Sequence, residues 1–392
     1  MPEAKLICSN CKNEYSLNTS LYRCGECSSP LTVDYEYENT IGSVGKSTFQ
    51  ERPRNIARYR EFLPTDDRMI SLGEGWTPIT TSNYYSKNTG AEVKFKLEYL
   101  NPTGSFKDRG TAVMLSKLLE LGRDSFVDDS SGNAGSSLAA YCAHAGVDCT
   151  IYTPARASGP KVRQIQMYGA DLRKIEGGRA RVAKVAEKEA NNGNHYYASH
   201  NLNPFFLEGM KTLAYEVAEQ YEWHPPENIL FPVGGGALLI GTHRGFKELS
   251  EIDLIDRIPS LYAIQSEACQ PVVKAFKSGQ TSLQPVDPKH TVAEGIHIGI
   301  PHRGKEIISA LRDSNGGAAS VTEKEIVDHF STLPRKEGVY AEPTSAVSFA
   351  GLTTLKEEGH IRTGEEVLIP VTGFGLKEAN LAREVVGSPQ QK

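Results

Sequence analysis

Lys107 lies in a stretch whose residue types and spacing suit covalent chemistry by an amine. The stretch reads Asn-Pro-Thr-Gly-Ser-Phe-Lys-Asp-Arg-Gly over residues 101–110, and its proline and first glycine interrupt regular structure. An apolar-periodic run at 112–119 follows and predicts a helix, for which Thr103 and Ser105 are candidate N-caps. Lys107 then falls in the first helical turn, where the helix dipole disfavours a cation. Most lysines are solvated surface residues, but this place favours an amine that is neutralised, paired or bound as an imine.

Two glycine-containing runs further along the chain each lie between a predicted strand and a predicted helix. The first, Ser-Ser-Gly-Asn-Ala-Gly at 130–135, follows a predicted strand at 125–128. The second, Pro-Val-Gly-Gly-Gly-Ala-Leu at 232–238, follows a predicted strand at 229–233. Small residues let backbone N–H groups approach a ligand closely, and a helix N-terminus attracts anions. Taken alone, each run is equally compatible with a plain strand-to-helix turn.

Helical and extended runs alternate with short connections from about residue 112 to a third junction, Val-Thr-Gly-Phe-Gly-Leu-Lys at 371–377. Such alternation predicts an α/β fold with mostly parallel sheets flanked by helices. Ligands gather at the carboxyl ends of the strands in such sheets, and all three junctions follow predicted strands. A shorter amphipathic helix is predicted at 53–63, with its arginines on a solvated face.

The stretch around Lys107 and the three junctions resemble one family, the pyridoxal-phosphate (PLP) enzymes of the tryptophan synthase β type, or fold type II. Within that family the chain most resembles threonine synthases, from about residue 71 to 380. The matching segments are Ser-Leu-Gly-Glu-Gly-Trp-Thr-Pro at 71–78, Pro-Thr-Gly-Ser-Phe-Lys-Asp at 102–108, Ser-Ser-Gly-Asn at 130–133, Glu-Gly-Ile at 294–296, Glu-Pro-Thr-Ser-Ala at 342–346 and Thr-Gly-Phe-Gly-Leu-Lys at 372–377. The resemblance implies two helix-flanked, mostly parallel α/β domains.

The resemblance also implies a role for each matched residue. Lys107 would hold the coenzyme as an imine and then abstract the Cα proton of the substrate. Asn133 would contact the phenolic oxygen of PLP, and Thr372 would hydrogen-bond its pyridine nitrogen. A hydroxyl partner leaves that nitrogen largely neutral, which favours elimination and replacement over transamination. The other implied coenzyme contacts are Phe106 and the phosphate-binding run Gly234, Gly235, Gly236, Ala237 and Leu238; the implied substrate contacts are Ser105, Ser130, Ser131, Gly132 and Ala134.

Two departures from threonine synthases bear on the substrate. In that family the segment Asn-Pro-x-Arg-x-Glu-Gly supplies an arginine to the phosphate of the substrate, whereas this chain has Phe206 there. A phenyl ring cannot replace a bidentate guanidinium contact, so either Lys161, Arg163 or Lys211 binds the phosphate or the substrate has none. The triple glycine at 234–236 replaces the family's Gly-Asn-Ala-Gly-Asn and is closer to serine and threonine dehydratases.

Four of the seven cysteines predict a metal site near the beginning of the sequence. They form a Cys-x2-Cys-x12-Cys-x2-Cys array, and their odd total and clustering argue against a disulfide framework. Two Cys-x2-Cys turns complete a tetrahedral zinc site, and four thiolates leave no open position for catalysis. We therefore predict a structural zinc ribbon at 1–40, with strand-prone runs at 22–23 and 31–37. Its ligands are Cys8, Cys11, Cys24 and Cys27.

The bulk composition is that of an ordinary soluble protein. The 392 residues are 39% hydrophobic and 23% charged, and the net charge of -5 gives no electrostatic reason to expect nucleic acid or an anionic membrane as a partner. The longest weakly polar run, 229–242, is too short to span a bilayer, and the first residues lack the apolar region of a secretory signal. We expect a cytoplasmic protein whose partner is a small amino-acid substrate, and a homodimer is compatible with the sequence.

The sequence therefore predicts a PLP-dependent lyase. The leading reaction converts O-phosphohomoserine and water to threonine and phosphate. The alternative is a serine/threonine deaminase or a β-replacement enzyme that acts on a non-phosphorylated amino acid. A third hypothesis, a non-catalytic zinc-ribbon interaction protein, is opposed by the retention of Lys107, Asn133 and Thr372. The expected domains are the ribbon at 1–40, a linker and entry segment of the large domain at 41–110, a small α/β domain at 111–195 and a large PLP-binding α/β domain at 196–392.

Overall fold

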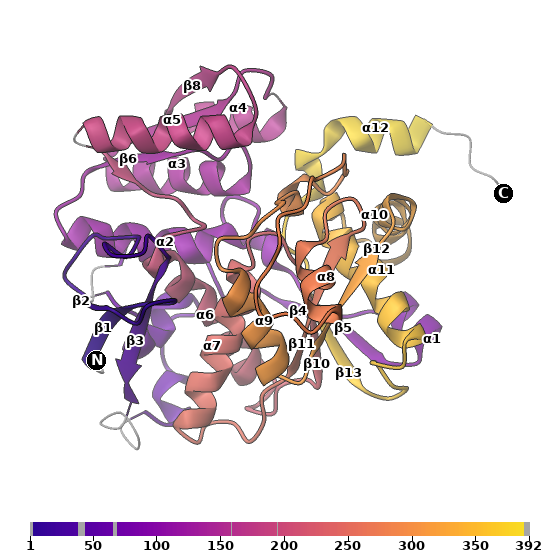
Figure 1. Cartoon of the computed structure of the whole chain (residues 1–392). Coiled ribbons are helices and arrows are strands. Elements are labelled where there is room, and N and C mark those ends of the chain that lie inside the picture. Colours follow the sequence, from indigo (N-terminus) through magenta and orange to yellow (C-terminus); the bar gives the residue numbers. More distant parts are fainter. Residues whose placement is uncertain (1–2, 38–43, 66–68, 158, 194, 388–392) are drawn as a thin grey trace. The chain divides into compact units, whose positions relative to one another are not determined.

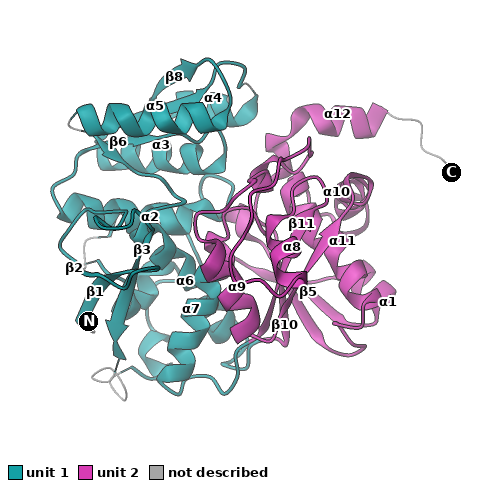
Figure 2. Cartoon of the chain, in the orientation of Figure 1, with its two compact units in different colours: residues 1–76, 101–225, 240–258 teal, residues 77–100, 226–239, 259–392 magenta. Residues whose placement is uncertain are grey.

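The computed structural model describes residues 3–37, 44–65, 69–157, 159–193 and 195–387 (Figure 1). The chain divides into two compact units (Figure 2). Unit 1 comprises residues 1–76, 101–225 and 240–258, and unit 2 comprises residues 77–100, 226–239 and 259–392. Both units are thus discontinuous in sequence. Residues 41–43 and 66–68 of the expected linker and entry segment lie outside the described residues.

The N-terminal part of unit 1 is a small antiparallel sheet. Its strands β1 (Glu3–Cys8), β2 (Glu14–Ser16) and β3 (Leu31–Glu36) lie in the order β2-β1-β3. Leu6, Leu31 and Val33 are fully buried on one face of this sheet. The strand expected at 31–37 is therefore present, whereas the run at 22–23 makes only a single bridge, between Arg23 and Pro30.

The second sheet of unit 1 is parallel, in the order β8-β7-β6-β9. Helices α3 and α5 contact this sheet and flank it, as Figure 1 shows. This is the helix-flanked parallel arrangement that the alternating pattern predicts. Its strands are β6 (Ser125–Asp128), β7 (Asp148–Pro154), β8 (Asp171–Ile175) and β9 (Tyr196–Tyr197), and its helices are α3 (Asn133–Ala145), α4 (Pro160–Met167) and α5 (Arg179–Asn192).

Two long helices, α2 (Lys107–Glu120) and α6 (Pro204–Gln220), pack closely against each other in unit 1. Glycine makes the close approach possible, because a Cβ at Gly209 would lie 2.0 Å from the carbonyl oxygen of Arg109. The side chain of Arg109 is fully buried and pairs with Glu216 of α6 at 2.5 Å. The helix that begins with Lys107 is thus held by backbone contact and by a buried ion pair.

The predicted amphipathic helix at 53–63 is a 3-10 helix, η3 (Ile56–Phe62), which follows a shorter one, η2 (Lys46–Phe49). The expectation that its arginines are solvated is wrong for Arg58, whose side chain is only 4% exposed. Its guanidinium donates to both carboxylate oxygens of Glu219 on α6, at 2.8 and 2.5 Å. A bidentate carboxylate partner makes burial of the charge tolerable, and the sequence pattern does not reveal that partner.

Unit 2 is built on a six-stranded sheet in the order β12-β11-β10-β13-β5-β4, parallel except for the edge strand β4. Its strands are β4 (Ile79–Thr81), β5 (Glu92–Lys96), β10 (Asn228–Pro232), β11 (Ser260–Ser266), β12 (Gly317–Val321) and β13 (Glu366–Pro370). Its helices are α1 (Asn83–Thr89), α8 (Pro271–Lys277), α9 (Gly304–Asp313), α10 (Glu323–Glu337), α11 (Pro343–Glu357) and α12 (Ala379–Gly387), with 3-10 turns η4 (Glu98–Leu100), η5 (Glu294–Ile296) and η6 (Gly375–Lys377). Helix α7 (Ala237–Glu251) begins in unit 2 and continues in unit 1.

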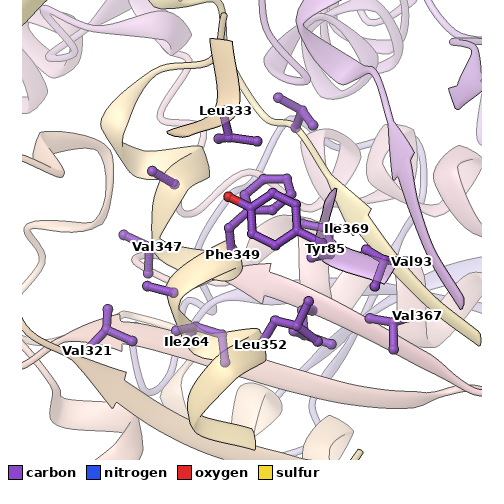
Figure 3. Packing of buried hydrophobic residues seen from close by; sticks show 14 of the residues in the cluster. Tyr85, Val93, Ile264, Val321, Leu333, Val347, Phe349, Leu352, Val367 and Ile369 are labelled. Carbon is purple, nitrogen blue, oxygen red and sulfur yellow. The ribbon is translucent and has the colours of Figure 1, made fainter. Parts of the chain in front are cut away.

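The core of unit 2 lies between helix α11 and the sheet (Figure 3). Val347, Phe349 and Leu352 of α11 are fully buried with Val93 and Val367 of neighbouring strands. Burial of such side chains stabilises the fold by about 1.5–3 kcal/mol each. This layer therefore holds in place the strands that precede the glycine run and Thr372. Within the described residues no helix is both long and apolar enough to cross a membrane.

Candidate active site

Lys107 is the first residue of α2, as the sequence predicts. The predicted N-caps are wrong, because Phe106 occupies the cap position and no side chain caps the helix. Thr103 instead donates from its backbone N–H and its hydroxyl to the carboxylate of Asp108, at 2.7 and 2.6 Å. Ser105 is fully buried, and its hydroxyl oxygen has no hydrogen-bond partner among the described residues. Asp108 thus ties the preceding loop to the helix and fixes the place of Lys107.

Aromatic rings lie around the amine of Lys107. Its Nζ atom is 4.7 Å from the ring centroid of Phe106 and 5.6 Å from that of Phe206 on α6. Phe206 is 1% exposed. The residue that stands where threonine synthases have an arginine therefore places an apolar face toward the amine. An ammonium over an aromatic face is attracted by the ring, so the two rings help to hold the amine in place.

The loop with Asn133 connects β6 to α3, and Asn133 is the first residue of that helix. Gly132 is the cap residue, in extended conformation and without a side-chain cap. Glycine is required at Gly135, because a Cβ there would lie 1.9 Å from the carbonyl oxygen of Ser130. The loop is therefore folded back tightly on the first turn of α3. The N-terminus of a helix suits a carboxylate or another anion.

Three ionisable residues of unit 1 belong to the surroundings of Lys107 but were not singled out from the sequence: Asp128, Asp129 and His200. Asp128 ends β6 and is 1% exposed, and His200 follows β9, the neighbouring strand. The Nδ1 atom of His200 lies 3.7 Å from an oxygen of Asp128, and the imidazole is 5.9 Å from the ring of Phe206. Two consecutive carboxyl groups at the end of a strand were a usable signal. His200 gave none, because β9 has only two residues.

Burial shifts the ionisation of these groups. It raises the pKa of Asp128 to about 7, and the positive charge of Lys107 only partly opposes the shift. It also raises the pKa of Asp129, with repulsion from Asp128 adding to the effect. Burial lowers the pKa of His200 to about 3, and the charge of Lys107 lowers it further. Near neutral pH, His200 is therefore uncharged and Asp128 can give or take a proton.

The glycine run of unit 2 follows β10 and ends at the N-terminus of α7. A Cβ at Gly234 would lie 2.9 Å from the Cα of Ile296 and 3.0 Å from the carbonyl oxygen of Gly295. Gly236 has a φ of 81°, a left-handed conformation that other residues adopt only under strain. These glycines are therefore required by the backbone. They leave N–H groups uncovered by side chains beside a helix N-terminus, which suits a dianionic phosphate.

Thr372 lies directly after β13 and is 1% exposed. Its hydroxyl is hydrogen-bonded to the hydroxyl of Ser345 at 2.9 Å and donates to Glu342 at 3.3 Å. Gly373 allows this arrangement, because a Cβ there would lie within 2.5 Å of the Glu342 carboxylate. The three polar side chains fix the orientation of a hydroxyl that could face the nitrogen of a heteroaromatic ring.

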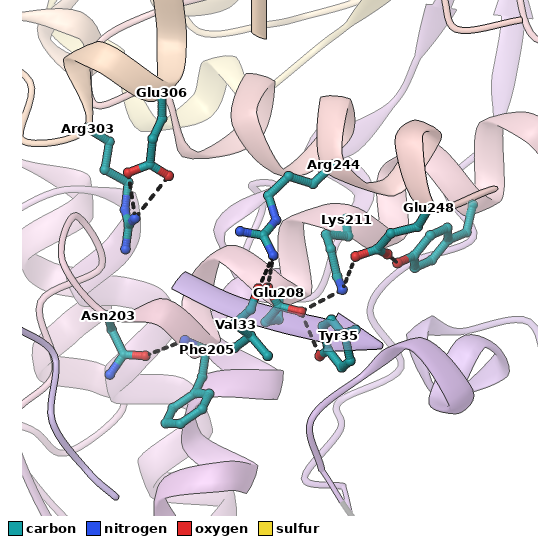
Figure 4. Close-up of polar contacts among 11 residues, drawn as sticks. Val33, Tyr35, Asn203, Phe205, Glu208, Lys211, Arg244, Glu248, Arg303 and Glu306 are labelled. Carbon is teal, nitrogen blue, oxygen red and sulfur yellow. Dashed lines mark hydrogen bonds and ion pairs between the residues drawn. The ribbon is translucent and has the colours of Figure 1, made fainter. Parts of the chain in front are cut away.

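Lys211, one of the cations considered for a substrate phosphate, is fully buried in another network (Figure 4). Its ammonium lies 2.5 Å from Glu208 and 2.8 Å from Glu248. The hydroxyl of Tyr35 on β3 donates to Glu208 at 2.7 Å, so the network joins the N-terminal sheet to α6. Two carboxylates already neutralise this cation, so it does not serve as a phosphate ligand. Of the other candidates, Arg163 is exposed and Lys161 is half-buried on α4.

The four N-terminal cysteines converge as the array predicts. The Sγ atoms of Cys8, Cys11, Cys24 and Cys27 all lie within 4.8 Å of one another. Tetrahedral thiolates at about 2.3 Å from a zinc ion lie at such separations. The donor set therefore fits a closed, structural zinc site of a ribbon.

Comparison with known proteins agrees with this geometry. The sequence profile of the family described as pyridoxal-phosphate dependent enzyme matches residues 70–373. The chain is 36% identical over 379 residues to the threonine synthase of Methanocaldococcus jannaschii, which covers 96% of this chain and 93% of that protein. It is 34% identical over 390 residues to the threonine synthase of Methanosarcina acetivorans, covering 98% and 95%. The profile includes Lys107, Asn133, the glycine run and Thr372.

Solved structures share the fold at lower identity. A fungal L-serine ammonia-lyase from Rhizomucor miehei has a TM-score of 0.71 at 17% identity and covers 82% of this chain and 100% of its own. Serine racemase from Dictyostelium discoideum has a TM-score of 0.62 at 26% identity and covers 76% and 92%. The α/β fold predicted from the sequence is thereby confirmed.

Proposed function

Because the chain belongs to the family of pyridoxal-phosphate-dependent enzymes, we propose that it catalyses the threonine synthase reaction, from O-phosphohomoserine and water to threonine and phosphate. The observation that carries the proposal is 36% identity to a threonine synthase along nearly the whole of both chains. PLP, when bound, would supply an electron sink for the carbanion formed by loss of the Cα proton.

The residues of the site fit the coenzyme. Lys107 would be its attachment point, and the rings of Phe106 and Phe206 lie beside its amine, at 4.7 and 5.6 Å from Nζ. The run at 234–236, where a Cβ at Gly234 would meet backbone and Gly236 has a positive φ, would hold the phosphate group. Thr372, oriented by Ser345 and Glu342, would hydrogen-bond the ring nitrogen.

The remaining residues would hold the substrate. The loop at 130–134, with Asn133 at the start of α3, would bind the substrate carboxylate through backbone N–H groups, while the Asn133 side chain contacts the coenzyme. The buried hydroxyl of Ser105 has no hydrogen-bond partner among described residues, so it is available to a bound molecule. Lys107, once released from the coenzyme, would remove the Cα proton.

A second candidate is favoured by the surroundings of Lys107. Phe206 replaces the phosphate-binding arginine, Lys211 is neutralised elsewhere, and Asp128 and Asp129 add carboxyl groups. These groups suit a non-phosphorylated amino acid that loses a β-substituent, as in a serine/threonine deaminase. The N-terminal cysteines would bind a structural zinc ion in either case.

The two candidates are separated by supplying the pure, PLP-loaded protein with O-phosphohomoserine and, separately, with threonine. Release of phosphate with formation of threonine supports the first reaction. Formation of 2-oxobutyrate from threonine, with no phosphate release from O-phosphohomoserine, would replace it by the second. Borohydride reduction followed by peptide mapping should place the coenzyme on Lys107, and a Lys107→Ala variant should lose both the label and the activity.

A further inference from the structure

Two buried polar atoms near Lys107 have no hydrogen-bond partner among the described residues. They are Oδ1 of Asp128 and Nδ1 of His200. Their side chains approach each other only to 3.7 Å, between Nδ1 and the other oxygen of Asp128, which is longer than a hydrogen bond. A buried polar group without a partner costs about 1–3 kcal/mol, so such pairs are expected to bind a water molecule or a ligand group.

The pair of Asp128 and His200 lies where it could act on a substrate together with Lys107. Asp128 ends β6 and His200 follows β9, its parallel neighbour, at the edge where ligands gather in parallel sheets. The ring of Phe206 connects the two groups, because it lies 5.6 Å from the Nζ of Lys107 and 5.9 Å from the imidazole of His200. Asp129, next in sequence, is already bonded to the hydroxyl of Tyr197 at 2.7 Å.

The chemistry of the pair favours a neutral hydroxyl over a charged group. A hydroxyl can donate to the carboxylate of Asp128 and also interact with either tautomer of the imidazole. A phosphate would meet the carboxyl groups of Asp128 and Asp129, with Lys107 and, more weakly, Arg179 as the positive charges acting on this region. The ring of Phe206 offers no hydrogen bond to a charged group.

We propose that Asp128 and His200 form a subsite for the oxygen atom at Cβ of the amino acid, either the hydroxyl of threonine or the water that becomes this hydroxyl. This inference rests on the proposed function. It applies to both candidate reactions, because each forms or breaks a bond between Cβ and a hydroxyl oxygen.

Asp128 and Lys107 together give and take the protons that both candidate reactions require. In the synthase direction, the water oxygen bonds to Cβ of the unsaturated side chain, and one water proton passes to the carboxylate of Asp128. The ammonium of Lys107 returns a proton to Cα, so the sum is addition of H and OH without oxidation or reduction. In the deaminase direction, Lys107 takes the Cα proton, Asp128 protonates the leaving hydroxyl, and water departs. A carboxyl group with a pKa of about 7 can act in both directions near neutral pH.

The experiment compares binding of L-threonine with that of L-2-aminobutyrate, which lacks only the hydroxyl. Dissociation constants for the PLP-loaded protein are taken from the change in coenzyme absorbance, recorded in a stopped-flow instrument before turnover. The wild type should prefer threonine about tenfold, the value of one hydrogen bond of about 1.4 kcal/mol. The Asp128→Asn variant should bind both compounds almost equally. The matched control is Asp171→Asn, since Asp171 is exposed on β8 of the same unit and pairs with Arg173.

Each outcome decides the proposal. Loss of the preference in Asp128→Asn, with the control unchanged, supports the subsite. A wild type without preference, or an Asp128→Asn variant that keeps it, overturns the subsite and leaves the proposed function intact. If neither amino acid changes the absorbance of a coenzyme that borohydride reduces, the proposed function itself fails. Should Asp128→Asn not fold, His200→Phe answers the same question, because it removes the other polar partner and keeps a ring.

Discussion

The contact between α2 and α6 makes a strong prediction for Gly209→Ala. The added Cβ would lie 2.0 Å from the carbonyl oxygen of Arg109, 2.6 Å from its carbonyl carbon and 2.7 Å from the Cα of Gly110. All three atoms belong to the backbone of α2, so no side-chain rotation can relieve the contact. The two helices must separate, and the first turn of α2 carries Lys107.

Two opposing effects determine how much the substitution lowers the free energy of unfolding. Overpacking costs about 1–3 kcal/mol, and rigid backbone contacts place this site at the upper end. Alanine in place of glycine inside a helix contributes about 1 kcal/mol in the favourable direction. The net loss is therefore about 2 kcal/mol, which lowers the melting temperature by roughly 4–8 °C at about 2–4 °C per kcal/mol.

Differential scanning calorimetry on the PLP-free protein measures this shift without interference from the coenzyme. The matched control is Gly178→Ala, because Gly178 precedes helix α5 with a negative φ and nothing lies within 4 Å of an added Cβ. The control should shift by no more than about 1–2 °C, since exchange of glycine for alanine at a cap costs a few tenths of a kcal/mol or slightly more. Equal melting temperatures for Gly209→Ala and the wild type would refute the argument that backbone contact holds α2 in place.

Three further predictions concern the ribbon and the buried charges. Tyr35→Phe removes the donor to Glu208 and should lower the free energy of unfolding by about 1–3 kcal/mol, measured by urea denaturation; an unchanged midpoint would mean that the bond contributes nothing. Cys24→Ser, or removal of metal by a chelator, should lower the melting temperature and the zinc content measured by elemental analysis, and a variant that keeps a full equivalent of zinc contradicts a four-thiolate site. The pKa of Asp128 is about 7 in the folded protein, above its value in the unfolded chain. Ionisation of this group should therefore lower the free energy of unfolding of the wild type as pH rises from about 4 to 7. Asp128→Asn should lack that loss, so its stability relative to the wild type should increase over this interval, and a constant difference would contradict the shift.

Local patterns in the sequence identified much of the candidate site. Lys107 begins a helix because helix breakers precede an apolar-periodic run, and these are short-range signals. The spacing of the four cysteines predicted that their thiols lie together, because each Cys-x2-Cys turn directs two thiols toward the same point. The parallel sheets followed from the alternation of strands and helices, which depends on the period of apolar residues.

Charged residues were harder to interpret from sequence. Arg58 and Lys211 have the sequence surroundings of surface cations, yet both are buried against glutamates. Arg58 pairs with Glu219, which is distant in sequence, and Lys211 pairs with Glu208 one turn earlier on α6 and with Glu248 on α7. Periodicity reports how apolar residues are distributed, and it does not report which carboxylate will neutralise a given cation. The cost of burying a charge is decided by that partner.

The sequence alone predicted Lys107 as the candidate coenzyme-binding lysine, and it determined the cysteine cluster, the α/β class and the family. Only the tertiary structure showed that Phe206 lies beside the amine of Lys107, that Gly209 sets the distance between α2 and α6, and that Asp128 lies beside His200. The physical reason is the range of the interactions involved. Helix starts, strand periods and Cys-x2-Cys turns are specified within a few residues, whereas burial, pKa shifts and unsatisfied polar atoms depend on chain segments brought together from distant positions.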